Sequence, residues 1–268
     1  MNLELKSPIN ERMGIHIPDE VSNLSLPFNG SFATTDGDEY RVKNNIINMM
    51  VNDPEFSSIA LSTNHWKLTA SIYEDIWRKR SLTLLSGEDF PIEKEHELLI
   101  EWTEPKNGGL YLDVGASTAL YARALKAAQP NANIVALDFS LQMLEEARIK
   151  AEADETDLFL VRADGRDMPF FSNTFDALVM GGTLNELSDP TKVLYEANRV
   201  LKKDGCFFMM HLTKSDIWYG RLLQESATFG GIKFWTKNES NKLFEQCGFR
   251  VDKQINRGIV CFTRLLPN

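Results

Sequence analysis

The chain has 268 residues and a formal net charge of −9 at pH 7, and 43% of its residues are hydrophobic. This length suits one large domain with a small N-terminal extension, and the hydrophobic fraction allows a substantial core. The acidic balance argues against nucleic-acid binding, because phosphate contacts need clustered Lys and Arg. The N-terminus lacks the apolar segment of a signal peptide, and no apolar run approaches about 20 residues, so we expect a cytoplasmic protein without a membrane span.

The three cysteines, Cys206, Cys247 and Cys261, are dispersed along the chain. An odd number of cysteines without a pairing pattern indicates buried free thiols in a reducing compartment. A tetrahedral zinc site needs about four Cys or His ligands at suitable spacing. No such set occurs, so we expect no metal.

The first segment, residues 1–60, is expected to form an N-terminal extension. Residues 24–53 alternate in character around an Asp36-Gly37 turn, which predicts a small β module. No cysteine precedes Cys206, so this module must be metal-free and must share the core of its neighbour. The apolar residues available for that contact are Ile46, Ile47, Met49 and Met50.

Residues 61–108 are expected to form a helical cap. Tyr73 and Trp77 are four residues apart and so lie on one helical face. Such a pair fits a core stripe as well as a lid over a substrate. Both residues are therefore candidate acceptor-binding residues.

Residues 110–118 combine a short apolar strand, the acid Asp113 and a turn of small residues, Gly115, Ala116 and Ser117. An alanine-rich helix follows. A strand that leads through such a turn into a helix N-terminus brings backbone N–H groups close to a ligand. A carboxylate at this point repels a pyrophosphate but attracts the ammonium of an amino-acid-like cofactor.

The next strands repeat this arrangement. Residues 133–138 end in Asp138, which follows Asp113 by 25 residues and is suited to the hydroxyls of a ribose. Phe139 offers an aromatic surface for an adenine. Residues 158–161 lead towards Asp164 and Gly165 at the end of the next strand, where the residues alone also allow Asp164 to be a solvated loop acid.

Residues 175–180 form a further strand that opens into Gly181. A helix at 190–201 and a strand at 206–212 complete the alternation, which indicates a doubly wound parallel sheet with its ligand at the carboxyl ends of the strands. Two helices follow, at 216–226 and 236–248. Residues 249–254 and 258–264 alternate in character and predict a hairpin.

Four segments together resemble the ordered motifs of class I S-adenosylmethionine-dependent methyltransferases, namely residues 113–118, 137–138, 163–170 and 175–178. The resemblance implies a seven-stranded, Rossmann-like α/β domain over residues 109–268, with a C-terminal antiparallel hairpin. It also implies methyl transfer from S-adenosylmethionine. The candidate cofactor-binding residues are Asp113, Gly115, Ala116, Ser117, Asp138, Phe139, Asp164, Gly165 and Gly181.

In the family pattern, the turn after Asp113 wraps the methionine end, Asp138 binds the ribose and Asp164 binds the adenine amino group. The three glycines usual for this turn are Gly115, Ser117 and Ala119 here. The substitutions keep small side chains but leave less room for the backbone to approach the cofactor. Because the backbone approaches the cofactor less freely, cofactor affinity is the property that these substitutions affect.

Residues 72–78 and 90–95 resemble a plastid and bacterial methyltransferase subgroup whose members often begin with a zinc-ribbon-like module. The resemblance implies that residues 24–53 are a degenerate, metal-free form of that module. We expect the acceptor to be a small molecule, aromatic or prenylated, methylated on oxygen or carbon by a monomer or homodimer. RNA methylation, cofactor binding without catalysis and nicotinamide-dependent reduction are the alternatives.

A general base is not marked by any motif. Glu186 and His211 are the candidates, and His211 points either into the cleft or into the core. Asn185 can orient an acceptor without taking its proton. Trp218 and Tyr219 begin the helix after the last parallel strand and are expected to face the acceptor.

Overall fold

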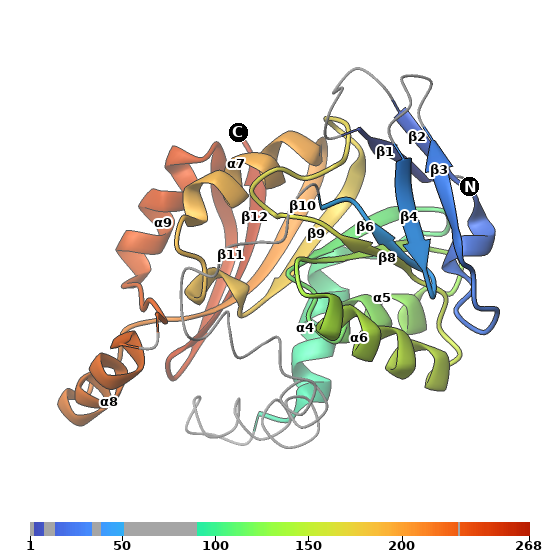
Figure 1. Ribbon diagram of the computed structural model, residues 1–268. Helices are drawn as coiled ribbons and strands as arrows, with labels where there is room; N and C mark the ends of the chain where they lie inside the picture. Colours follow the sequence, from blue (N-terminus) through green and yellow to red (C-terminus); the bar gives the residue numbers. More distant parts are fainter. Residues whose placement is uncertain (1–2, 8–13, 34–38, 51–89, 230) are drawn as a thin grey trace.

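The computed structural model describes residues 3–7, 14–33, 39–50, 90–229 and 231–268. One mixed sheet runs through the molecule, with helices on both faces (Figure 1). Two clusters of buried apolar side chains form the core, one on each face of this sheet. The arrangement is the three-layer α/β architecture that alternating strands and helices predict.

The sheet has the strand order β11-β12-β10-β9-β6-β7-β8-β5-β4-β3. Strands β5 to β10 are paired in parallel along this order, whereas β12 pairs antiparallel with both β10 and β11. The bounds are β3 Gly30–Ala33, β4 Glu39–Lys43, β5 Ile46–Asn48, β6 Leu110–Val114, β7 Asn133–Asp138, β8 Phe159–Arg162, β9 Phe175–Gly181, β10 Leu201–Leu212, β11 Phe249–Arg257 and β12 Val260–Pro267. Strands β6 to β12 confirm the predicted Rossmann-like sheet and its C-terminal hairpin.

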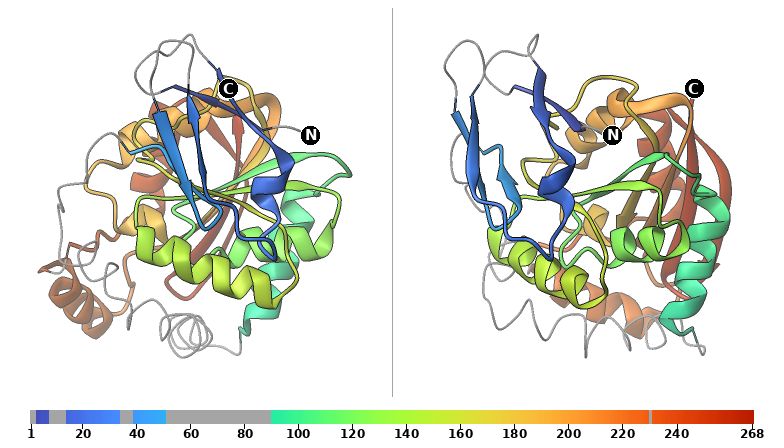
Figure 2. Two further views of the ribbon diagram at one scale, coloured as in Figure 1. Left: turned by 45° about the vertical axis from the view of Figure 1, so that its right-hand side comes forward. Right: turned by 90° about the vertical axis from the view of Figure 1, so that its right-hand side faces the viewer.

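The helices divide between the two faces of the sheet (Figure 2). Helices α4, α5 and α6 contribute to one buried cluster, and α7 and α9 contribute to the other. The helices are α4 Ile92–Thr103, α5 Leu120–Ala128, α6 Leu141–Ala153, α7 Pro190–Val200, α8 Trp218–Phe229 and α9 Lys237–Gln246. Among these helices, none has both the length and the apolar character that a bilayer crossing requires.

Local sequence signals explain where two of these helices begin. The hydroxyl of Ser140 accepts the Met143 N–H at 3.3 Å and caps α6. The hydroxyl of Thr236 caps α9 by accepting the Glu239 N–H at 3.2 Å, and Glu239 Oε2 in turn accepts the Thr236 N–H at 2.7 Å. These reciprocal bonds satisfy donors that a helix N-terminus leaves without partners.

The N-terminal strands join the central sheet instead of forming a module of their own. Strand β5 pairs in parallel with β8, with Ile47 opposite Val161, and β4 and β3 continue the sheet outward. Ile46 and Ile47 lie in opposite core clusters, so this short strand is anchored on both of its faces. A separate β1–β2 hairpin (Leu3–Lys6 and Gly14–Ile17) and a short 3₁₀ helix, η1 (Asp19–Ser22), pack nearby.

A buried amide holds this N-terminal region together. Asn45 Nδ2 donates to the carbonyls of Val21 and Asn23 at 3.0 and 3.1 Å, while its Oδ1 accepts the Phe28 N–H at 3.1 Å. Asn45 has no solvent exposure and a left-handed φ of 65°. Asn is among the residues that adopt this conformation most readily.

Only the C-terminal part of the expected helical cap falls within the described residues. Its helix α4 packs into the layer formed by α5, and the Trp102 ring meets Phe208 of β10 edge-on at 5.9 Å between centroids. The Arg264 Nε donates to the Trp102 carbonyl at 2.8 Å. Tyr73 and Trp77 lie outside the described residues.

Candidate functional site

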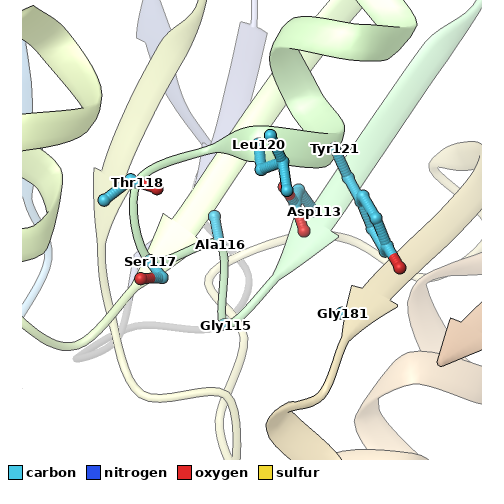
Figure 3. A pocket seen from close by; sticks show the side chains of 8 residues that line it. All are labelled: Asp113, Gly115, Ala116, Ser117, Thr118, Leu120, Tyr121 and Gly181. Carbon is cyan, nitrogen blue, oxygen red and sulfur yellow. The ribbon is translucent and has the colours of Figure 1, made fainter. Parts of the chain in front are cut away.

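A pocket opens where the carboxyl ends of β6 and β9 meet the start of α5 (Figure 3). The close-up shows the small-residue turn curving around the pocket, with Asp113 and Tyr121 on the side of α5. The lining residues are Asp113, Gly115, Ala116, Ser117, Thr118, Leu120, Tyr121 and Gly181. The structure therefore brings the predicted turn residues and Gly181 into one site.

The backbone of the turn is left-handed at each position where the family usually has glycine. The φ angles are 68° at Gly115, 50° at Ser117 and 58° at Ala119. Ser and Ala adopt this conformation at a cost of about 1 kcal/mol each, which glycine avoids. The two substitutions thus keep the shape of the turn while adding backbone strain.

Gly115 is the position where a side chain has no room. A Cβ there would lie 2.5 Å from Thr183 Cγ2 and 2.6 Å from Thr183 Oγ1. The Thr183 hydroxyl also donates to the Gly115 carbonyl at 3.1 Å. Thr183 begins a short 3₁₀ helix, η3 (Thr183–Asn185), which therefore braces the turn from the end of β9.

Two features of the pocket match the charges of an amino-acid group. Asp113 is 2% exposed, and its Oδ2 accepts the Ala122 N–H of α5 at 3.1 Å. Helix α5 begins at Leu120, and its N-cap residue Ala119 has no side chain that could accept a hydrogen bond. Asp113 therefore accepts one N–H of a helix N-terminus that carries positive potential. A ligand with an ammonium and a carboxylate would find a complement to each.

Asp138 connects β7 to the turn. Its Oδ2 accepts the Ser117 N–H and its Oδ1 accepts the Ser140 N–H, both at 2.8 Å. Burial raises the pKa of this carboxyl to about 6, despite these hydrogen bonds to its charged form. The Phe139 N–H also donates to this carboxylate, so about one of its four lone pairs remains to accept a hydroxyl.

Asp164 lies just past the end of β8, whose neighbour is the strand that ends in Asp138. Burial alone would raise the pKa of this carboxyl, but hydrogen bonds from Arg166, with Nη2–Oδ2 at 2.6 Å, hold it below its ordinary value. Gly165 has room for a Cβ, which would meet Val193 at 3.7 Å. The half-buried Phe139 accepts from Arg162 Nε through its carbonyl at 3.0 Å.

Asn185 is joined to the protein backbone on three sides. Its Nδ2 donates to the carbonyls of Leu212 and Lys233 at 2.8 and 2.5 Å, and its Oδ1 accepts the Leu212 N–H at 2.7 Å. The side chain is 2% exposed. In this arrangement Asn185 fastens η3 to the end of β10 and to residue 233. Its amide is used in these backbone hydrogen bonds and is not directed at a methyl acceptor, contrary to the expectation from the sequence.

His211 lies in the core beneath α9. It has no solvent exposure and meets the Phe244 ring edge-on at 5.8 Å between centroids. Neither ring nitrogen has a hydrogen-bond partner within the described structure, and burial lowers the imidazole pKa to about 4. Glu186, by contrast, is partly exposed at the end of η3.

The buried His211 makes stability depend on pH. Its folded pKa lies below the ordinary value of 6.5, so the unfolded chain takes up a proton as pH falls from 6.5 to about 4 and the folded chain does not. The free energy of unfolding of the wild type should therefore fall by about 3 kcal/mol over this pH range because of His211, and His211→Leu should abolish that loss. Chemical denaturation at pH 7.5 and pH 4 measures it, with the exposed His16→Leu as the control. If the free energy of unfolding of both variants depended on pH in the same way, His211 would have to be as accessible to solvent as His16.

Trp218 and Tyr219 begin α8. Trp218 is 76% exposed and is absent from the lining of the pocket at the turn. The side chain of Tyr219 lies outside the described part of the chain. Figure 1 shows α8 standing off from the sheet near the ends of β10 and β11.

Sequence patterns did not indicate Thr183 or Tyr121 as site residues. The Tyr121 hydroxyl donates to a carboxylate oxygen of Glu95, a fully buried residue of α4. Tyr121 occupies a helical position typical of core residues, and Thr183 belongs to no motif. The Gly181-Gly182 pair was the nearest available signal for Thr183.

Comparisons with known proteins agree with this geometry. Residues 112–209 match the family model of a methyltransferase domain. An uncharacterised chloroplastic methyltransferase of Arabidopsis thaliana is 27% identical over 209 residues, covering 75% of this chain and 58% of that protein. A demethylmenaquinone methyltransferase of Staphylococcus carnosus is 33% identical over 149 residues, 54% of each protein. The chain thus spans about half the length of these curated relatives.

A solved structure shares the fold. The crystal structure of a methyltransferase from Aquifex aeolicus, described as dependent on S-adenosylmethionine, aligns with a TM-score of 0.57 at 22% identity. The alignment covers 73% of this chain and 96% of that one. At this identity the likeness confirms the predicted fold class.

Proposed function

Because the chain belongs to the class I S-adenosylmethionine-dependent methyltransferases, we propose that it methylates a small-molecule acceptor. The bound cofactor supplies a methyl group already activated on a sulfonium. The acceptor atom forms the new bond to this carbon as the bond to sulfur breaks, and sulfur keeps the electron pair. The protein then contributes alignment and, for a hydroxyl acceptor, a route for the proton.

The pocket at the turn carries the proposal. The Asp113 carboxylate and the N-terminus of α5 offer opposite charges within one site, as the two ends of a methionine require. A pyrophosphate would meet the same carboxylate at close range and be repelled. Asp138, Phe139, Asp164 and Gly165 are the proposed contacts to the ribose and adenine.

We propose Glu186 as the proton acceptor in preference to His211. Glu186 follows directly from η3, whose Thr183 touches the cofactor turn. His211 is enclosed by the core and already neutral with a pKa of about 4, so it has little basicity. Tyr73, Trp77, Trp218 and Tyr219 remain proposed walls of the acceptor site.

The acidic net charge and the relatives support a small acceptor, aromatic or prenylated, over RNA. The Staphylococcus carnosus relative is named for a menaquinone precursor. The three cysteines of the chain are buried and free, which supports a reducing compartment such as the cytoplasm. We propose a monomer or homodimer.

Transfer of labelled methyl groups tests this function. The protein is incubated with methyl-labelled S-adenosylmethionine and, separately, with a small-molecule extract and with purified RNA. We expect the label in the small-molecule fraction. Label in RNA alone would favour the RNA methyltransferase alternative, and cofactor binding without any transfer would favour a non-catalytic protein.

Asp113→Asn should weaken S-adenosylmethionine binding about 10- to 100-fold, because it removes the charge from a buried hydrogen bond to an ammonium. Asp157→Asn changes the charge by the same amount at an exposed loop position outside the pocket. Calorimetric titration of both variants gives the two dissociation constants. Equal constants would mean that Asp113 is not the ammonium partner.

A further inference from the structure

A second hollow, of about 460 Å³, lies between α8 and the segments that join this helix to β10 and to α9. Two of its lining residues, Phe234 and Trp235, are aromatic and come from the segment before α9. Three others are basic: Lys214, Arg221 and Lys233. An apolar wall combined with several cations is unusual in a chain whose net charge is −9.

Of the three cations, only Lys214 forms an ion pair within the described structure, with Nζ 3.0 Å from Glu239 Oε2. No ion pair neutralises Arg221 or Lys233 there. Arg221 Nε donates only to the Ser215 carbonyl at 2.8 Å, and Lys233 Nζ only to the Ser188 carbonyl at 2.6 Å. The hollow also contains Glu225, so its five charged side chains sum to +1. This net positive charge favours an anion over a neutral molecule as the ligand.

The aromatic wall contains a donor without an acceptor. Trp235 Nε1 is buried and has no hydrogen-bond partner in the described part of the chain. A buried N–H in this state gains most from an oxygen placed by a ligand. The indole and the Phe234 ring also offer surfaces on which an aromatic ring can pack.

The hollow is connected to the cofactor turn through η3. The Lys233 N–H donates to the Asn185 carbonyl at 2.7 Å, and Asn185 Nδ2 donates back to the Lys233 carbonyl at 2.5 Å. Two residues earlier, the Thr183 hydroxyl donates to the Gly115 carbonyl at 3.1 Å. One short helix therefore touches both the turn and a cationic wall of the hollow.

From this arrangement we propose that the hollow holds the methyl acceptor and that the acceptor is an aromatic compound bearing a carboxylate. This inference rests on the proposed methyl transfer and specifies its substrate class. Arg221 and Lys233 hold the carboxylate, and the ring packs on Phe234 and Trp235. The acidic group fixes the orientation of a ring that apolar walls alone would hold loosely.

Binding of two matched probes tests the assignment. In the presence of S-adenosylhomocysteine, 3,4-dihydroxybenzoate should bind at least tenfold more tightly than its methyl ester. Lys233→Gln and Arg221→Gln should each weaken the acid about tenfold and leave the ester unchanged. Trp235→Phe, which keeps a ring and removes the N–H, should weaken both probes.

Lys242→Gln is the matched control, because it removes one positive charge from an exposed site of α9 outside the hollow. It should change neither probe. Equal affinity for acid and ester, no binding of either, or indifference to Lys233→Gln and Arg221→Gln would overturn the inference. Binding of S-adenosylhomocysteine is recorded in the same titrations, so its absence identifies a failure of the proposed function instead.

Discussion

Gly115→Ala is expected to lower S-adenosylmethionine affinity at least about 100-fold. The new Cβ would lie 2.5 Å from Thr183 Cγ2, in a backbone with a φ of 68°. Displacing Thr183 would break its hydrogen bond to the Gly115 carbonyl and shift the turn away from its present shape. Titration calorimetry measures the loss, and thermal unfolding shows whether the fold survives.

Gly182→Ala is the control for backbone strain. Its φ of 90° is also left-handed, but a Cβ there would meet only Met210 Cε at 3.6 Å. It should reduce stability by about 1 kcal/mol and affinity only slightly. Gly115→Ala/Thr183→Gly, which removes the colliding side chain, should recover part of the affinity. Losses of equal size at Gly115 and Gly182 would contradict the steric explanation.

Asp138→Asn is expected to stabilise the fold at neutral pH while weakening cofactor binding. The carboxyl titrates near pH 6 in the folded chain against 3.8 ordinarily, so the folded state holds the proton more tightly. Between these pH values stability falls as pH rises, and the charged group costs about 3 kcal/mol at pH 7. Asn avoids this cost but loses the bond from the Ser117 N–H, about 1 kcal/mol.

The net expectation is a gain of about 2 kcal/mol at pH 7 that disappears by pH 4. Denaturant unfolding of the wild type and the variant at both pH values measures this difference. Cofactor affinity should fall, because the amide nitrogen can accept neither the ribose hydroxyl nor the Ser117 N–H. A variant less stable at pH 7 than at pH 4, relative to the wild type, would show that Asp138 is not destabilised by burial.

The strand, the small-residue turn and the helix that line the pocket were largely predictable from sequence, because their signals are local. Asp113, the small-residue turn and the helix after it are contiguous, and Asp138 follows at a spacing set by one strand–helix unit. The sequence also predicted the Thr236–Glu239 capping box, and the structure contains both of its hydrogen bonds. The turn and the capping box each depend on residues only a few positions apart, and the position of Asp138 depends on a single strand–helix unit.

The remaining features depend on contacts between distant residues. Nothing in Ile46–Asn48 specifies pairing with β8, so the sequence predicted a small β module that shares the core of the neighbouring domain and not strands of its sheet. The shared core is present, since Ile46, Ile47 and Met49 are buried in it. Strand β10 begins at Leu201, earlier than residue 206, and its register with β9 shifts at the polar stretch before Cys206. The direction of the His211 side chain depends on α9, whose Phe244 packs against the imidazole, and this contact between distant residues cannot be read from the local sequence.

The measurement that bears most directly on the central claim is a calorimetric titration of the purified chain with S-adenosylmethionine and, separately, with NADPH. The pocket at Asp113 predicts one binding site for S-adenosylmethionine and no detectable heat with NADPH, whose phosphates the carboxylate repels. The same titration on Gly115→Ala should show the signal lost. Tight NADPH binding with no response to S-adenosylmethionine would contradict the account.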